Sequence, residues 1–119
     1  MQGAPGRALV VDDDAALRLL CRVNLELEGF AVEEAATVAD ADAAIARERP
    51  DVVLLDVHLA TGDSHELLAR LRRDRIPVAL VTGSVDADDY RARADAVLTK
   101  PFLPQTLVET ARRLARVDR

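Results

Sequence analysis

The chain has 119 residues, of which 31% are charged, and its formal net charge is −5. This length suits one domain, and the acidic balance argues against the domain-wide basic surface that non-specific nucleic-acid binding needs. The single cysteine, Cys21, cannot form an intramolecular disulfide, and no stretch is apolar and long enough for a signal peptide or a membrane span. We therefore expect one cytoplasmic domain.

Short apolar segments along the chain predict β-strands. They cover residues 8–11, 30–35, 52–55, 78–81 and 96–99. The central segment follows Pro50, has four consecutive aliphatic residues and ends at Asp56, a pattern typical of a strand that is buried on both faces. The segment at residues 30–35 is weaker and is expected at an edge of the sheet.

Segments with helical periodicity separate these strands. The apolar positions that define them are Leu17, Leu20, Cys21 and Leu27; Ile45; Leu67, Leu68 and Leu71; and Leu107, Ala111 and Leu114. One of the three aspartates at residues 12–14 is expected to cap the first helix, Thr37 the second and Asp63 the third. A fourth helix, at about residues 87–93, must be short or irregular, because only 17 residues separate Thr82 from Lys100.

Strands that alternate with helices predict a doubly wound α/β fold with a five-stranded parallel sheet. The carboxyl ends of parallel strands lie at one edge, so side chains that directly follow different strands can converge there. The residues at these positions are Asp12, Asp13, Asp56, Thr82 and Lys100. Taken singly, an aspartate could be a helix cap, Thr82 could simply end a strand and Lys100 could be a surface residue.

Together these residues suit phosphoryl transfer. Carboxylates that share a pocket repel one another unless their pKa values rise or a cation joins them, and oxygen ligands with this charge favour Mg²⁺. Asp56 can act as a nucleophile that forms an aspartyl phosphate. The Thr82 hydroxyl and the Lys100 ammonium can each contact one phosphoryl oxygen.

The segments VVDDD, LLDV, VTGS and LTKPF resemble those of the receiver domain of two-component response regulators, over residues 8 to about 115. The resemblance implies a flavodoxin-like fold with strand order 2-1-3-4-5. It also implies that residues 1–119 form a single receiver domain, with residues 1–7 as a flexible N-terminal arm.

The resemblance assigns roles to the predicted site. Asp56 would be the phosphoacceptor, and Mg²⁺ would be held by Asp12, Asp13, Asp56 and the backbone carbonyl of His58. Thr82 would be the switch hydroxyl and Lys100 the phosphate partner, followed by a cis bond to Pro101.

The resemblance also implies the partners of the chain. The phosphodonor would be a sensor histidine kinase or a histidine phosphotransfer protein, and phosphorylation would change the affinity for a downstream protein. Direct contact with nucleic acid or with a membrane is not expected. The chain would not be a turnover enzyme.

Three features depart from the family pattern. Val97 stands where receivers often carry a switching aromatic residue, so a relay from Thr82 to an aromatic ring is excluded at that position. The shortened fourth helix resembles the FAT GUY subgroup of receivers. Ala60 and Ser64 replace the usual proline and glycine of the loop after the acceptor.

Two other functions fit parts of the pattern. A phosphatase of the haloacid-dehalogenase type also uses an aspartyl phosphate, but its motif would require Thr or Val where Ala16 stands. A phosphorylation-independent scaffold would agree with Val97 and the short fourth helix, although the predicted site residues are intact.

Overall fold

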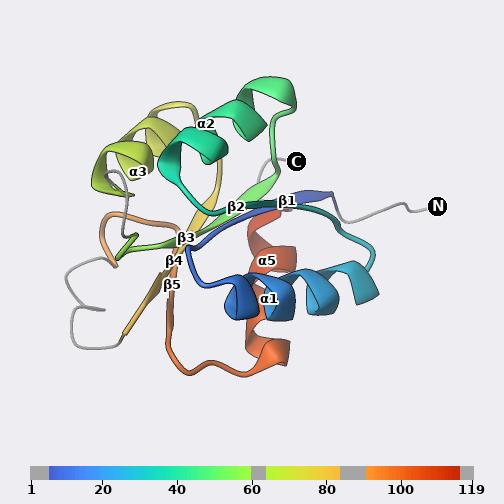
Figure 1. The fold of residues 1–119 in the computed structure, drawn as a ribbon. Coiled ribbons are helices and arrows are strands. Elements are labelled where there is room, and N and C mark those ends of the chain that lie inside the picture. Colours follow the sequence, from blue (N-terminus) through green and yellow to red (C-terminus); the bar gives the residue numbers. More distant parts are fainter. Residues whose placement is uncertain (1–5, 60–63, 84–90, 116–119) are drawn as a thin grey trace.

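A five-stranded parallel sheet lies between two pairs of helices in the computed structural model, which describes residues 6–59, 64–83 and 91–115. The strands are β1 (Arg7–Val11), β2 (Ala31–Ala35), β3 (Val52–Asp56), β4 (Val78–Thr82) and β5 (Ala96–Thr99). The helices are α1 (Ala15–Leu27), α2 (Val38–Arg47), α3 (Ser64–Arg73) and α5 (Pro104–Ala115). Helices α2 and α3 cover one face of the sheet, and α1 and α5 cover the other (Figure 1).

The strand order is β2-β1-β3-β4-β5, which confirms the predicted doubly wound arrangement. Every neighbouring pair is parallel, so all five strands end at the same edge of the sheet. The register places Val11 beside Leu55 and Thr82 beside Thr99. Strand β2 lies at the edge, as its weaker apolar pattern predicts.

The central strand β3 is buried on both faces. Val53 and Leu55 belong to the apolar core that includes residues of α2 and α3, while Val52 and Leu54 belong to the core that includes residues of α1 and α5. This alternation confirms the interpretation of the aliphatic run before Asp56 as a doubly buried strand. Cys21 lies in the core that includes residues of α1 and α5, with 2% of its surface exposed, as predicted.

Side-chain caps fix the first two helices. The Asp14 carboxylate accepts hydrogen bonds from the backbone N–H groups of Ala16 (2.9 Å) and Leu17 (3.3 Å), so Asp14 caps α1 and leaves the two preceding aspartates for other contacts. The Thr37 hydroxyl accepts from the N–H of Asp40 at 3.0 Å, which confirms the predicted cap of α2. Asp63, the predicted cap of α3, lies outside the described residues.

Two expected segments differ from the structure. Arg7 lies in β1, where its backbone N–H donates to the Asp51 carboxylate at 2.8 Å, so the predicted arm cannot extend to residue 7. Most of the predicted fourth helix lies outside the described residues, and residues 91–93 form a turn instead of helix. Directly after this turn, the Asp95 carboxylate accepts from the N–H of Val78 at 2.8 Å, which ties the chain to the start of β4.

Within the part of the chain that the structure describes, no helix combines the length and the apolar character needed to cross a membrane.

Candidate functional site

The carboxyl edge of the sheet gathers the predicted acidic residues. Asp12 and Asp13 directly follow β1, and Asp56 is the last residue of β3. One carboxylate oxygen from each of the three lies within 4.8 Å of the others. The convergence predicted from the positions of the strand ends is therefore present in the folded chain.

Lys100 brings a positive charge to this cluster from the end of β5. Its Nζ atom lies 3.8 Å from Oδ2 of Asp12 and 3.8 Å from Oδ1 of Asp56. The Lys100 side chain is 36% exposed, whereas the Asp12 and Asp56 side chains are 4% and 5% exposed. The ammonium group thus approaches two buried carboxylates while it retains contact with solvent. The peptide bond between Lys100 and Pro101 is cis, as the resemblance implies.

Burial raises the pKa of the Asp12 carboxyl above its ordinary value. A hydrogen bond from the N–H of Asp14 to Oδ1 of Asp12, at 2.8 Å, opposes this rise, and the negative charge of Asp56 adds to it. Lys100 also lowers the pKa of this carboxyl, but desolvation dominates. A cation that entered the cluster would favour the ionised form of Asp12.

Backbone contacts hold Asp56 at the end of β3. The N–H of His58 donates to Oδ1 of Asp56 at 3.1 Å. The buried Ser64 hydroxyl donates to the backbone carbonyl of Asp56 at 3.0 Å and thereby links the start of α3 to the acceptor strand. This contact of Ser64 was not predicted from the sequence, where Ser64 was noted only because it replaces a glycine. The one sequence feature that could have indicated it is the position of Ser64 at the beginning of the helix that follows the acceptor loop.

Thr82 places a buried hydroxyl at the end of β4. The residue is 1% exposed, and its Oγ1 atom has no hydrogen-bond partner among the described residues. Its backbone carbonyl accepts from the N–H of Lys100 at 2.8 Å, which aligns the ends of β4 and β5. A buried hydroxyl costs free energy unless it is satisfied, so Thr82 retains a donor and acceptor for a ligand.

Arg18 also contacts the acidic loop at residues 12–14, although it is not among the site residues predicted from the sequence. Arg18, on α1, donates to the backbone carbonyl of Asp12 at 2.7 Å and to the Glu34 carboxylate at 2.9 Å. Glu34 also accepts from Arg22 at 3.0 Å. The spacing of four residues between the two arginines places them on one helix face, which was the only sequence signal.

The donor set fits a hard divalent cation. Three carboxylates offer oxygen atoms only, two of the residues are buried, and the third, Asp13, is exposed to solvent. Mg²⁺ is typically bound by one or two carboxylates together with water and phosphate oxygens. The three carboxylates therefore form a group that could hold such a cation.

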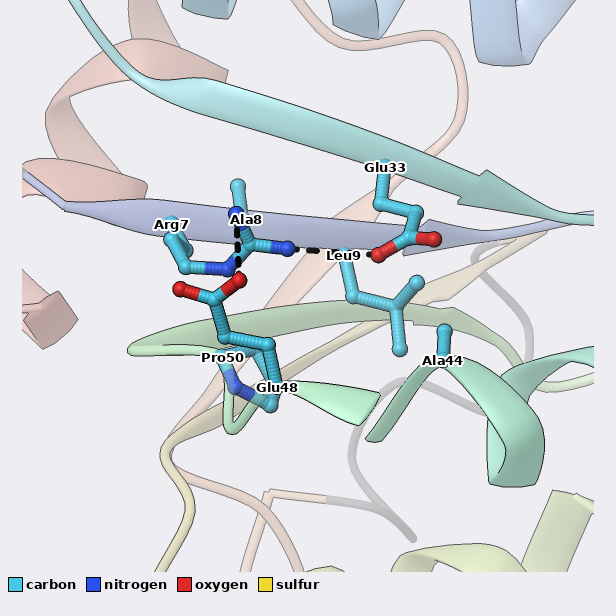
Figure 2. Close-up of a pocket in the computed structure, with 7 residues that line it drawn as sticks. All are labelled: Arg7, Ala8, Leu9, Glu33, Ala44, Glu48 and Pro50. Atoms are coloured by element: carbon cyan, nitrogen blue, oxygen red, sulfur yellow. Dashed lines mark hydrogen bonds and ion pairs between the residues drawn. The ribbon is translucent and has the colours of Figure 1, made fainter. Parts of the chain in front are cut away.

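A small hollow lies near the amino end of β1, away from this cluster. Its volume is about 10 Å³, and Figure 2 shows Arg7 beside it, paired with Glu33 and Glu48. Such a volume admits about one water molecule. This hollow is too small to compete with the acidic cluster as a ligand site.

The family model of the response regulator receiver domain matches residues 8–112. The chain belongs to this family. It is therefore a receiver domain of two-component response regulators, and neither the phosphatase nor the scaffold alternative is favoured.

Curated relatives agree with this assignment. The phosphate regulon transcriptional regulatory protein PhoB of Pseudomonas aeruginosa is 35% identical over 116 residues, which cover 91% of this chain and 51% of that protein. The response regulator MprA of a Mycobacterium species is 37% identical over 118 residues, covering 94% of this chain and 51% of that protein. The chain spans about half the length of these relatives.

Solved structures support the same fold. The receiver domain of NtrX from Brucella abortus has a TM-score of 0.86 and 30% identity, covering 92% of this chain and 98% of that one. The chemotaxis response regulator CheY4 of Vibrio cholerae has a TM-score of 0.82 and 28% identity, covering 95% and 99% of the two chains. Both similarities extend over almost the whole of each neighbour.

Proposed function

We propose that Asp56 accepts a phosphoryl group in this receiver domain. The observation that carries the proposal is the position of the Asp56 carboxylate, which is buried at the end of β3 within 4.8 Å of two further carboxylates and 3.8 Å from Lys100. A carboxylate oxygen of Asp56 attacks phosphorus, and the bond from phosphorus to the nitrogen of the donor histidine breaks. The departing imidazole takes up a proton, and an acyl phosphate remains on Asp56.

The surrounding residues supply charge and hydrogen bonds to the transferred group. Lys100 provides an ammonium group for one phosphoryl oxygen, and the Thr82 hydroxyl, which lacks a partner among the described residues, provides a hydrogen bond for another. Such groups act by positioning and by stabilising negative charge in the transition state. The proposed catalytic residues are therefore Asp56, Thr82 and Lys100.

The proposed metal ligands are Asp12, Asp13, Asp56 and the backbone carbonyl of His58. When bound, Mg²⁺ would neutralise part of the charge of the carboxylates and the phosphoryl group. The buried Asp12 and the exposed Asp13 would hold it from the β1 side of the pocket. Lys100 balances part of the remaining negative charge.

The proposed phosphodonor is the phosphohistidine of a sensor histidine kinase or a histidine phosphotransfer protein. Helix α1, which begins shortly after Asp12 and Asp13, exposes apolar side chains to solvent. They are Leu19 (58% exposed), Leu20 (40%), Val23 (47%) and Leu27 (77%). Exposed apolar side chains on the helix that directly follows Asp12, Asp13 and Asp14 suit contact with a helical protein partner.

The proposed output is a change in affinity for a downstream protein. Phosphate on Asp56 would engage Thr82 at the end of β4 and alter the surface formed by β5 and α5. Val97 is half-buried and packs against the core that includes α2 and α3, so an aromatic side chain takes no part at this position. The structural change that follows phosphorylation would instead depend on Thr82 and its backbone.

We further propose that residues 1–119 form one receiver domain, that it works in the cytoplasm, and that it catalyses no turnover reaction beyond its own phosphorylation and dephosphorylation. The family match over residues 8–112 supports the domain assignment. The net charge of −5 gives no support for direct binding of this stretch to nucleic acid. No membrane partner is proposed.

Phosphorylation can be tested with acetyl phosphate and Mg²⁺, followed by intact mass measurement. We expect the mass of one phosphoryl group on the wild-type chain, and none on Asp56→Asn or in excess EDTA. Phosphate on Asp56→Asn at the wild-type level would overturn the assignment of the acceptor. If the wild type takes up no phosphate and does not bind Mg²⁺ in a calorimetric titration, the proposed chemistry is wrong.

A further inference from the structure

Arg18 connects the acidic loop to the neighbouring edge strand. Its Nη1 atom donates to the backbone carbonyl of Asp12 at 2.7 Å, and its Nε atom donates to Oε1 of Glu34 at 2.9 Å. The Arg18 side chain is 17% exposed and the Glu34 side chain 25%, so this ion pair is partly buried. The register places Glu34 beside Val10, two residues before Asp12.

The contact completes a set of restraints on Asp12. The backbone N–H of Asp12 donates to the carbonyl of Ala35 at 3.0 Å, and its carboxylate accepts from Asp14. Arg18 holds the remaining backbone group, the carbonyl that leads into Asp13. Asp12 is thus held from β2 through its N–H and from α1 through its carbonyl, and the carbonyl belongs to the peptide that joins Asp12 to Asp13.

The guanidinium group suits this task because its donors are held in one rigid plane. Nη1 and Nε reach two acceptors at once, whereas the single ammonium nitrogen of lysine has no such fixed geometry. Arg18 also contacts a carbonyl and not a carboxylate oxygen of Asp12. It therefore adds positive charge beside the acidic cluster without occupying any of the carboxylate oxygens of the cluster.

We propose that Arg18, oriented by Glu34, is a positioning residue that presets Asp12 and Asp13 for a divalent cation. This inference rests on the proposed function, because it assumes that the acidic cluster binds Mg²⁺. Groups that orient metal ligands without touching the metal commonly change affinity or activity by about 10- to 100-fold when they are removed. Arg18 would act in this way through its hydrogen bond to the backbone carbonyl of Asp12, one of the proposed metal ligands.

Arg22 offers a matched control within the same helix. It contacts the other oxygen of Glu34 at 3.0 Å and Glu26 at 3.1 Å, whereas the Asp12 carbonyl is contacted by Arg18. Arg22→Gln and Arg18→Gln each remove one arginine from Glu34. A difference between the two variants therefore reports on the contact with the acidic loop.

The test is the dissociation constant for Mg²⁺ by isothermal titration calorimetry, with the thermal midpoint measured without metal. We expect Arg18→Gln to weaken Mg²⁺ binding about 10-fold or more and Arg22→Gln to leave it within about twofold. Arg18→Lys keeps the charge but loses the planar fork, so it should also weaken binding. Phosphorylation of Arg18→Gln by acetyl phosphate should recover towards the wild-type maximum as Mg²⁺ is raised.

Other outcomes would overturn the inference. Unchanged affinity in Arg18→Gln, even with a lowered thermal midpoint, would leave Arg18 with a purely structural role. Equal weakening in Arg18→Gln and Arg22→Gln would exclude a specific effect on the acidic loop, and full binding by Arg18→Lys would exclude the geometric argument. If Arg18→Gln does not fold, the Mg²⁺ affinities of Arg18→Lys and Glu34→Gln replace it in the test. Weaker binding by both variants would support the inference, and unchanged binding by both would overturn it. Absence of Mg²⁺ binding by the wild type would instead refute the proposed function, and the inference with it.

Discussion

The ammonium nitrogen of Lys100 lies 3.8 Å from Oδ1 of Asp56, although the two residues end different strands of the sheet. Strand β4 lies between β3 and β5, so the long lysine side chain spans the end of a strand to reach the carboxylate. At this distance the Lys100 ammonium group can stabilise negative charge that develops on Asp56.

Replacement of Lys100 by Met should slow phosphorylation of Asp56 by acetyl phosphate. A hydrogen bond to a charged group contributes about 1.5–3 kcal/mol, so its loss in the transition state predicts a decrease of about 10- to 100-fold. The rate is measured by intact mass over time at saturating Mg²⁺. Lys100→Arg, which keeps the charge, should retain more activity than Lys100→Met, and equal rates in wild type and Lys100→Met would refute this role.

Replacement of Thr82 by Val should separate stability from function. The change removes a buried hydroxyl without a partner among the described residues, so the unphosphorylated protein should gain about 1 kcal/mol in its free energy of unfolding. The same variant should be phosphorylated more slowly, because the phosphoryl oxygen loses a donor. Urea unfolding and phosphorylation kinetics measure the two effects, and Thr82→Ser is the control that keeps the hydroxyl. Loss of stability without any change in rate would contradict the prediction.

The raised pKa of Asp12 predicts a pH-dependent effect on stability in EDTA. Between the unfolded value of 3.8 and the higher folded pKa, the folded state binds this proton more readily than the unfolded chain. The contribution of Asp12 to the free energy of unfolding therefore falls as pH rises through this window, and ionised Asp12 is destabilising at neutral pH.

Asp12→Asn should accordingly be more stable than wild type at pH 7, with a difference that shrinks as the pH falls below the folded pKa of Asp12. Urea unfolding from about pH 4 to pH 7 in EDTA measures this trend. Saturating Mg²⁺ should stabilise wild type more than the variant. If the stability difference between Asp12→Asn and wild type grows as the pH falls, the predicted direction of the Asp12 pKa shift is wrong.

Burial raises the pKa of the Cys21 thiol to about 12 from an ordinary value of 9.0. The thiolate is the reactive form, so at pH 8 the folded chain should react with iodoacetamide about 1000-fold more slowly than the unfolded chain. Intact mass after timed alkylation, with and without urea, provides the measurement. Similar rates in both states would place the thiol outside the core.

Much of the fold followed from local patterns. Aliphatic runs that end abruptly at polar residues define buried strands, and the run before Asp56 is buried on both faces as predicted. Thr37 caps its helix as expected, because the cap is a contact between residues three positions apart. The segment before β5 was predicted less well: residues 91–93 form a turn, and Asp95 is bound to the distant N–H of Val78.

The sequence alone determined the fold class and the residues that meet at the carboxyl edge of the sheet, because parallel strands end together whatever their separation along the chain. It left open which of three consecutive aspartates caps α1, and the folded chain assigns that cap to Asp14. Only the tertiary structure disclosed the contacts of Ser64 with Asp56 and of Arg18 with Asp12 and Glu34. Hydrogen bonds between side chains and backbone groups from different elements depend on distances of about 3 Å and on orientation, and both are set by packing that no local pattern encodes.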